Sequence, residues 1–535
     1  MHLIYDPWLT VRKRDGSRLR IRPCDLVDIE IADVDAPRAD LVVAARTFLI
    51  GLMTTAGLAD TESDWQRLYE NPPTADTINA ALARFASAFE LLGDGHRFCQ
   101  HQAVVEDGDR QRIASLLIDG PSEESDERNH DVMMDVLGLS PSTAALALYA
   151  LQQFAPSGGR GHRQSMRGGS PMSTLVSGGR TLWHNVWLNV ETNEQLAARS
   201  PRQWQHPPAI GDVFPWMGHV RTSETHLETT TSDAHPLQVY WQMPRLLWLE
   251  AGHAGNDRCG LTGESSHMLV RGYYRRQLGV KYSVDWRHPH VPYVRKASGI
   301  LPARASARAS HIGDWLGIVY RDQHGDREPA AVATTASTHR VWSITDASLR
   351  VDVFGFDMRS RKVLGAISHV MPIITVDPVD ADDLRAAVER CVLAVELVAQ
   401  TVVKMAWGAL VGPETKDAQR RATSSEADSV VRDFLTAMER HVEGAIRTAA
   451  AEIQAGSFDP LAHARTLHSD IRREVEAAFD ARLPTDTWVR GLERRVRKRW
   501  ELSRFLSGLG KSGAELFARL QLPTPEAKKE AKNAA

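Results

Sequence analysis

A glycine- and arginine-rich segment carries the residues whose chemistry is most distinctive. From Phe154 to Val190 the chain has seven glycines, four arginines and no carboxylate, although the whole protein has a formal net charge of −3. Glycine lets backbone amides approach a groove closely, and guanidinium groups neutralise phosphates. The pattern predicts a loop that enters the minor groove of DNA, where readout is partly degenerate; the alternative is a flexible surface connection. The residues predicted to make the contact are Gly158, Gly159, Arg160, Gly161, Arg163 and Arg167.

A second basic stretch runs from Arg271 to Arg308. It has nine lysines and arginines, one acidic residue (Asp285) and interleaved aromatic residues. Cations mixed with stacking rings are typical of nucleic-acid binding. The same rings are equally compatible with a place in the core.

A third basic patch, RGLERRVRKRW, runs from Arg490 to Trp500. Helical spacing places four of its cations on one face, so they could follow a phosphate backbone. The alternative is an ordinary solvated helix face. The four residues are Arg490, Arg494, Arg497 and Lys498.

Motifs of catalysis are missing from the sequence. It has no GxxxxGK[ST] phosphate loop, no GxSxG elbow, no HExxH helix and no cluster of carboxylates for a two-metal nuclease. His288 and His290 in RHPH, with His267, are the nearest approach to a metal site, and such loop histidines are more often structural. The four cysteines are far apart and form no CxxC pair. We therefore expect neither catalysis, nor a cofactor, nor a bound metal.

The predicted secondary structure that positions these residues differs from one part of the chain to the next. Asp15-Gly16 lies between two β-prone runs and predicts a hairpin. Apolar periodicity predicts helices over 40–53, 77–92 and 142–154, the last leading into the glycine-rich segment. Residues 119–135 are acidic and rich in turn formers. Short aromatic and β-branched runs then alternate with Pro and Gly up to about residue 374, which indicates mixed structure with several small sheets.

Four long helical segments are predicted beyond Pro378. With short connections they favour an antiparallel four-helix bundle, and they cover residues 380–410, 425–453, 460–482 and 486–508. The predicted fold class is α+β, with a mixed α/β domain over 1–374, the bundle over 375–515 and a disordered tail over 516–535. The start lacks a signal peptide, and no uninterrupted apolar run reaches about 18 residues. We expect a cytoplasmic protein without membrane contact.

Six longer stretches, spread over nearly the whole chain, resemble those of a known family in their order and spacing. They are PWLTVRKRDG at 7–16, HRFCQ at 96–100, GGRGHRQSMRGGSPMSTLV at 158–176, HPLQVYWQMPR at 235–245, WRHPHVPY at 286–293 and VFGFDMRSRKVLGAISHVMPI at 353–373. Together they resemble the CasA family, the large subunits of the type I-E CRISPR surveillance complex called Cascade. The resemblance implies a mixed α/β domain followed by a four-helix bundle.

The resemblance also implies a role and partners. A CasA-like subunit assembles with the other Cascade subunits and the guide RNA, and inspects double-stranded target DNA for a protospacer-adjacent motif. It then helps to separate the strands and docks the CRISPR helicase-nuclease, so that it does not cut DNA itself. This division of labour leaves the remaining sequence readout to base pairing. An interaction scaffold that docks the nuclease without sensing DNA is the alternative, and a stand-alone nuclease is a third interpretation.

Residue by residue, the resemblance places the family's minor-groove glycine loop on 157–161, with Arg160 where a glycine is common. A family lysine that reaches the groove aligns with Arg276 or Gln277, and the available cations are Arg275, Arg276 and Lys281. The strand-separating hairpin wedge falls on 358–362. Its residues here are Arg359, Ser360, Arg361 and Lys362, and arginine both stacks on bases and holds phosphates.

Some CasA-like proteins hold zinc with two cysteine pairs. The corresponding positions here are Ser140, Thr143, Cys259 and Thr262. Three of the four ligands are replaced, so the resemblance predicts no zinc in this chain.

Overall fold

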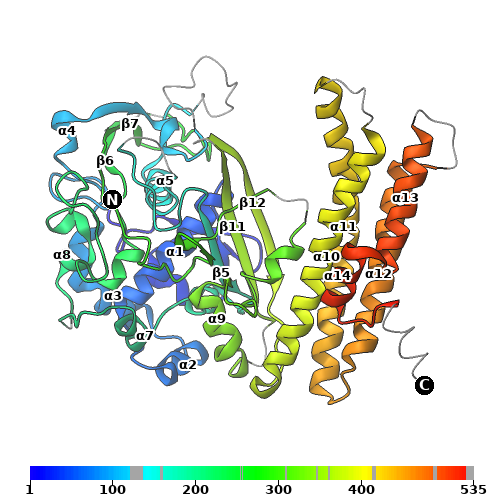
Figure 1. The fold of residues 1–535 in the computed structure, drawn as a ribbon. Coiled ribbons are helices and arrows are strands. Elements are labelled where there is room, and N and C mark those ends of the chain that lie inside the picture. The colour runs from blue at the N-terminus through cyan, green and yellow to red at the C-terminus, as the bar shows by residue number, and fades with distance from the viewer. Residues whose placement is uncertain are drawn as a thin grey trace. The chain divides into compact units, whose positions relative to one another are not determined.

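The computed structural model separates the chain into two compact units (Figure 1). The first is Met1–Ala307 with Pro329–Ile373, and the second is Arg308–Glu328 with Ile374–Ala535. The structure describes residues 1–120, 136–156, 161–205, 207–253, 255, 257–307, 310–344, 348–359, 362–411, 417–485 and 491–525.

Short strands and helices alternate in the first unit. Its strands are β1 (Leu9–Lys13), β2 (Arg18–Ile21), β3 (Ile31–Val34), β4 (Asp109–Arg112), β5 (Met172–Ser177), β6 (Leu246–His253), β7 (Met268–Arg276), β8 (Tyr293–Lys296), β9 (Gly299–Pro302), β11 (Arg350–Arg359) and β12 (Lys362–Pro372). Its helices are α1 (Ala39–Ala56), α2 (Glu62–Glu70), α3 (Ala75–Leu82), α4 (Val104–Asp107), α5 (Pro141–Gln153), α6 (Leu182–Trp187), α7 (Asn193–Ala198), α8 (Ile210–Val213) and α9 (Ala331–Thr338).

The strands form small separate sheets. Three of them have the orders β2-β1-β3, β4-β7-β6 and β12-β11-β5, and β8 pairs with β9 as a hairpin. The predicted turn at Asp15-Gly16 joins β1 to β2, with Gly16 at a φ of +86°, a conformation that glycine adopts without steric cost. The prediction of an α+β fold with several small sheets is confirmed.

Helix α1 lies at the centre of the first unit's core. Phe48 meets the rings of Trp8, Phe89, Tyr149 and Trp241 edge to face, an arrangement that aromatic pairs prefer. By length and composition α1 is also a candidate membrane span, but 78% of that window is buried inside the structure. Its packing is that of a core helix.

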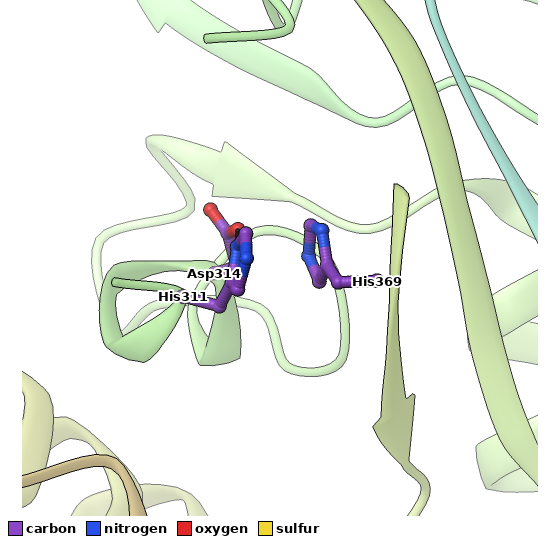
Figure 2. A group of neighbouring side chains, drawn as sticks. All are labelled: His311, Asp314 and His369. Atoms are coloured by element: carbon purple, nitrogen blue, oxygen red, sulfur yellow. Dashed lines mark hydrogen bonds and ion pairs between the residues drawn. The ribbon is translucent and has the colours of Figure 1, made fainter. Parts of the chain in front are cut away.

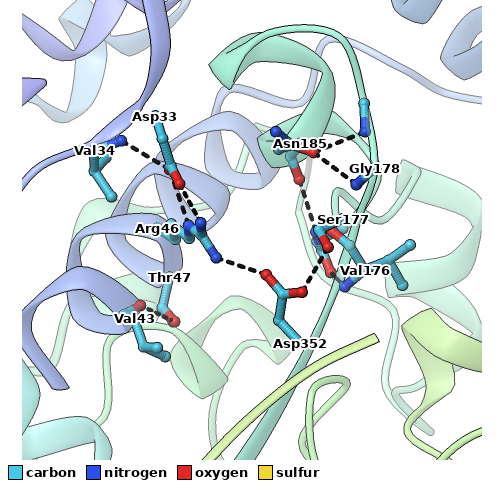
Figure 3. A network of polar contacts seen from close by, with 12 residues as sticks. Asp33, Val34, Val43, Arg46, Thr47, Val176, Ser177, Gly178, Asn185 and Asp352 are labelled. Atoms are coloured by element: carbon cyan, nitrogen blue, oxygen red, sulfur yellow. Dashed lines mark hydrogen bonds and ion pairs between the residues drawn. The ribbon is translucent and has the colours of Figure 1, made fainter. Parts of the chain in front are cut away.

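A polar network fastens α1 to its neighbours (Figure 3). The Arg46 guanidinium donates from Nε to Asp33 of β3 at 3.0 Å and from Nη1 to Asp352 of β11 at 2.8 Å. Ser177 of β5 donates to the other oxygen of Asp352 at 2.7 Å. One arginine thereby ties β3, α1 and the β5–β11 pair together.

Long helices dominate the second unit. They are α10 (Ala381–Leu410), α11 (Asp417–Gln454), α12 (Pro460–Arg482), α13 (Leu492–Leu506) and α14 (Gly510–Leu520), and a two-residue strand β10 (Arg327–Glu328) precedes them. The sequence predicts the first four helices. The sequence does not predict helix α14. This helix includes residues 516–520 of the predicted disordered tail, and it is stabilised by burial of Leu516, Phe517 and Leu520.

Candidate nucleic-acid interface

Residues 154–156 and 161–165 lie on either side of the predicted glycine contacts, and we call them the two stems of the glycine-rich segment. Short hydrogen bonds hold these stems. Ser165 N–H donates to the carbonyl of Ala155 at 2.8 Å, which closes the base of the segment. The predicted contacts Gly158, Gly159 and Arg160 lie outside the described residues. The candidate site is therefore built from the residues on either side of them.

Arg245 joins the two stems. Its Nη2 donates to the carbonyl of Pro156 at 2.7 Å and its Nη1 to the carbonyl of Arg163 at 2.6 Å. The residue is 7% exposed. Burial, together with the nearby charge of Arg275, lowers the pKa of Arg245 to about 10. Arg245 ends the motif HPLQVYWQMPR, but the sequence alone does not indicate this contact.

Gly161 connects the glycine-rich segment to the second basic stretch. Its carbonyl accepts a hydrogen bond from the Leu278 N–H at 2.8 Å. Its φ is +81°, and a Cβ at this position would lie 2.5 Å from the side-chain oxygen of Gln277. Glycine is thus required both by the backbone conformation and by the close approach. The hydrogen bond brings two sequence patches, more than 100 residues apart, into one place.

Arg163 and Arg167, the two predicted arginine contacts that the structure describes, have different surroundings. Arg163 is half-buried, and its Nε donates to Ser223 Oγ at 2.7 Å. Arg167 is fully buried, lies over the ring of Phe154 and donates to Ser173 Oγ and Gln153 Oε1 at 3.1 and 3.3 Å. Burial lowers the pKa of Arg167 to about 10. The prediction that Arg167 contacts DNA is wrong, because its guanidinium belongs to the core.

The cations of the second patch lie at and beyond the end of β7. Arg276 forms ion pairs with Asp107 at 3.0 Å and Glu224 at 3.3 Å, and Lys281 pairs with Glu228 at 3.1 Å. Arg275 is half-buried and has no ion pair within the described residues. Two of the three predicted cations, Arg276 and Lys281, therefore already have carboxylate partners.

The aromatic residues of this stretch are mostly core residues. Tyr273, Tyr282, Trp286 and Tyr293 are each at most 8% exposed, whereas Tyr274 is half-buried. The Tyr282 hydroxyl, for example, accepts a hydrogen bond from the Met243 N–H at 3.1 Å. Four of the five rings are thus not available for base stacking.

The predicted wedge is the tip of the β11–β12 hairpin. Arg359 and Lys362 are the last paired residues of the two strands and are both exposed. Ser360 and Arg361 lie outside the described residues. The register shifts after Asp357, and the exposed fraction of Leu364 is 61%. The tip carries cations beside an exposed apolar side chain.

The predicted basic face of the helical unit lies on α13. Lys498 pairs with Glu501 at 2.6 Å, and Arg497 lies 3.5 Å from the same carboxylate. A Cβ at Gly408 of α10 would lie 2.9 Å from Lys498 Cε, so the lysine stem packs against α10. Arg494 is half-buried on the same face, and Arg490 lies outside the described residues. These contacts favour the interpretation of a solvated, ion-paired helix face.

The histidines of RHPH are buried in the first unit. His288 and His290 are at most 1% exposed and lie beside the ring of Tyr240. Burial, followed by the charge of Arg167, places the pKa of both imidazoles well below the ordinary value. His267, also singled out in the sequence, is exposed and belongs to the segment that leads into β7. His288 and His290 are therefore core residues.

The four positions that correspond to zinc ligands in related proteins do meet in space. Cys259 Sγ lies 3.6 Å from Thr143 Oγ1, which is 3.0 Å from Ser140 Oγ. Burial raises the pKa of the Cys259 thiol, but hydrogen bonds from the Ser140 backbone and from Thr262 outweigh it and lower the pKa to about 7. One thiol among hydroxyls does not fit the thiolate, imidazole and carboxylate set that binds zinc.

A histidine–aspartate pair in the second unit carries further ligand atoms. His311 Nδ1 and Asp314 Oδ2 lie 3.2 Å apart (Figure 2). His369, drawn in the same figure, belongs to strand β12 of the first unit.

Comparison with known proteins assigns the chain to a family. Residues 2–479 match the family model of the CRISPR-associated protein Cse1, so the chain belongs to that family. This confirms the resemblance seen in the sequence, since one of the similar solved structures is titled Thermus thermophilus CasA (Cse1).

Solved structures support the same fold over the whole length. The Thermus thermophilus CasA (Cse1) structure has a TM-score of 0.67 at 18% identity and covers 95% of this chain and 99% of its own. Thermobifida fusca Cse1 has a TM-score of 0.66 at 16% identity, with coverages of 97% and 98%. A chain of a structure titled CRISPR RNA-guided surveillance complex has a TM-score of 0.70 at 16% identity, with coverages of 94% and 99%.

Proposed function

We propose that this chain is the large, non-catalytic subunit of a Cascade-type surveillance complex. In it the chain assembles with the other subunits and the guide RNA, inspects double-stranded DNA for a protospacer-adjacent motif, helps to separate the strands and docks a helicase-nuclease. Membership of the Cse1 family supports the proposal, as does the structural likeness to a chain of an RNA-guided surveillance complex.

One contact carries the DNA-sensing part of the proposal. The hydrogen bond between Leu278 N–H and the Gly161 carbonyl holds the glycine-rich stem against the basic stretch that follows β7. The backbone of the glycine-rich stem and the basic stretch therefore lie side by side. Minor-groove binding needs both, because backbone must approach the groove closely and cations must neutralise phosphates.

The test uses Arg163→Ala and Arg276→Ala in the full-length chain, assembled into its complex. Each substitution removes one cation, so we expect weaker binding to all duplexes and a flatter dependence of log K on log salt, by about 0.9 for each phosphate that is no longer neutralised. Fluorescence polarisation at several salt concentrations measures both. Lys296→Ala, an exposed lysine of the same basic stretch on β8, is the matched control. Unchanged affinity and slope in the two arginine variants contradict the proposal.

An interaction scaffold remains the second candidate function. Leu492, Val496 and Trp500 follow one another at four-residue spacing on α13, and the exposed fractions of Val496 and Trp500 are 48% and 58%. Exposed apolar side chains at helical spacing are typical of protein contacts. DNA-binding assays of the isolated chain and of the assembled complex separate the two candidates, and incubation with plasmid and divalent metal tests for a nuclease.

A further inference from the structure

One acidic segment supplies partners to three of the predicted DNA-binding cations. We call residues 222–229, TSETHLET, the acidic strap. Ser223 Oγ accepts from Arg163 Nε at 2.7 Å, Glu224 pairs with Arg276 at 3.3 Å and Glu228 pairs with Lys281 at 3.1 Å. Cations from two sequence patches therefore meet the same short segment.

The backbone fixes both ends of the acidic strap. Ser223 N–H donates to the carbonyl of Leu278 at 3.1 Å, and Thr229 N–H donates to the carbonyl of Lys281 at 2.7 Å. Between these anchors, His226 N–H closes one helical turn onto the Thr222 carbonyl at 3.0 Å. These main-chain contacts fix the backbone of the acidic strap beside the segment that carries Arg276 and Lys281, independently of the ion pairs.

The ion pairs themselves are exposed enough to exchange partners. The exposed fractions are 57% for the Glu224 side chain and 36% for Glu228, against 27% for Arg276 and 40% for Lys281. Exposed pairs of this kind stabilise a protein by only about 0–1 kcal/mol each. A phosphate therefore replaces such a carboxylate at little cost in folding stability.

We propose that Glu224 and Glu228 determine specificity by competing with DNA phosphates for Arg276 and Lys281. This rests on the DNA-sensing function proposed above. A duplex held by phosphate contacts alone must displace both carboxylates, as well as Asp107 from Arg276, and gains little. A motif-bearing duplex adds groove contacts from the glycine-rich stem, and these offset the displacement. The acidic strap thereby lowers sequence-independent affinity more than motif-dependent affinity.

The test replaces both carboxylates by their neutral isosteres in the full-length chain, as Glu224→Gln with Glu228→Gln. We expect the complex to bind a motif-free fluorescent duplex about tenfold more tightly, since two weak, exposed pairs no longer compete. The slope of log K against log salt becomes steeper by about 1 to 2, and the preference for motif-bearing duplex falls. Glu264→Gln, which removes a carboxylate from the exposed pair with Arg20 on β2, is the matched control.

Two outcomes separate the role of the acidic strap from the DNA-sensing function. If Arg163→Ala and Arg276→Ala weaken binding but the double glutamine variant binds as the wild type does, the acidic strap does not compete with DNA. If the arginine variants also bind normally, the DNA-sensing function itself fails. Weaker binding by the glutamine variant, with a lower melting temperature, would assign the acidic strap a purely structural role and overturn the inference.

Discussion

At the scale of single residues, Arg245 combines burial, a positive charge and neutral partners. A buried charge is costly unless it is paired or fully hydrogen-bonded. Its guanidinium donates to the carbonyls of Pro156 and Arg163, and its backbone N–H donates to Gln152 at 3.1 Å. Charge-assisted bonds to carbonyl groups are stronger than neutral ones. The geometry makes Arg245 a positioning residue for the glycine-rich stem.

The Arg245→Met variant removes the guanidinium and keeps the side chain apolar. We expect the loss of its two charge-assisted hydrogen bonds to the carbonyls of Pro156 and Arg163 to cost about 1.5–3 kcal/mol each. The Leu278 and Ser165 amides should exchange with solvent faster, because the two sides of the loop separate. Hydrogen exchange measures this locally, and DNA affinity should fall with it. The amides between β5 and β11 serve as the internal control. Faster exchange everywhere would contradict a local positioning role, whereas Arg245→Lys should restore little, since an ammonium group cannot span both carbonyls.

At the scale of elements, the β11–β12 hairpin projects cations at its tip. The whole of β11 pairs with β12, from Arg350 opposite Pro372 to Arg359 opposite Lys362. β11 also pairs with β5, which anchors only the half from Arg350 to Gly355. The end that carries Arg359 and Lys362 extends beyond the pairing with β5, where the wedge is predicted.

Replacing Arg359 and Lys362 together by serine tests this wedge in the assembled complex. We expect duplex capture, measured by polarisation, to stay near wild type, because the glycine-rich stem is unchanged. Strand opening, followed by a fluorescent base beside the motif, should slow roughly thirtyfold if each of the two contacts with an unstacked base is worth about 1 kcal/mol. Arg350→Ser, at the opposite end of the same strand, is the control. Normal opening in the double variant would reject the wedge.

Periodicity predicted the long helices better than it predicted single side chains. Helices α10 to α12 agree with the predicted segments within a few residues, except that α11 begins earlier, because long amphipathic patterns identify helices well. The second predicted helix, 77–92, is α only to Leu82 and continues as a 3₁₀ turn to Phe89. Arg167 has the same local signal as Arg163, but it is buried, with Ser173, Gln153 and the ring of Phe154 around its guanidinium. Such contacts depend on tertiary packing, which composition does not record.

At the scale of the whole molecule, positive and negative charges nearly balance, whereas several histidines have pKa values below the ordinary one. The chain has 64 lysines and arginines against 67 acidic residues, so attraction to DNA depends on local groups. Among its 21 histidines, several are buried where the neutral form is favoured. Burial lowers the pKa of each of these, and they are His2, His101, His288, His290, His463 and His468.

These histidines make folding stability depend on pH. Below the ordinary value of 6.5, the unfolded chain binds protons at positions where the folded chain does not, so stability falls as pH decreases from there. Each fully buried ring contributes a slope of about 1.4 kcal/mol per pH unit. Urea denaturation between about pH 7.5 and 5.5, followed by tryptophan fluorescence, measures the total. His288→Gln and His290→Gln should each reduce that slope by one such contribution, and a slope equal to the wild type would show that the imidazole takes up a proton in the folded state.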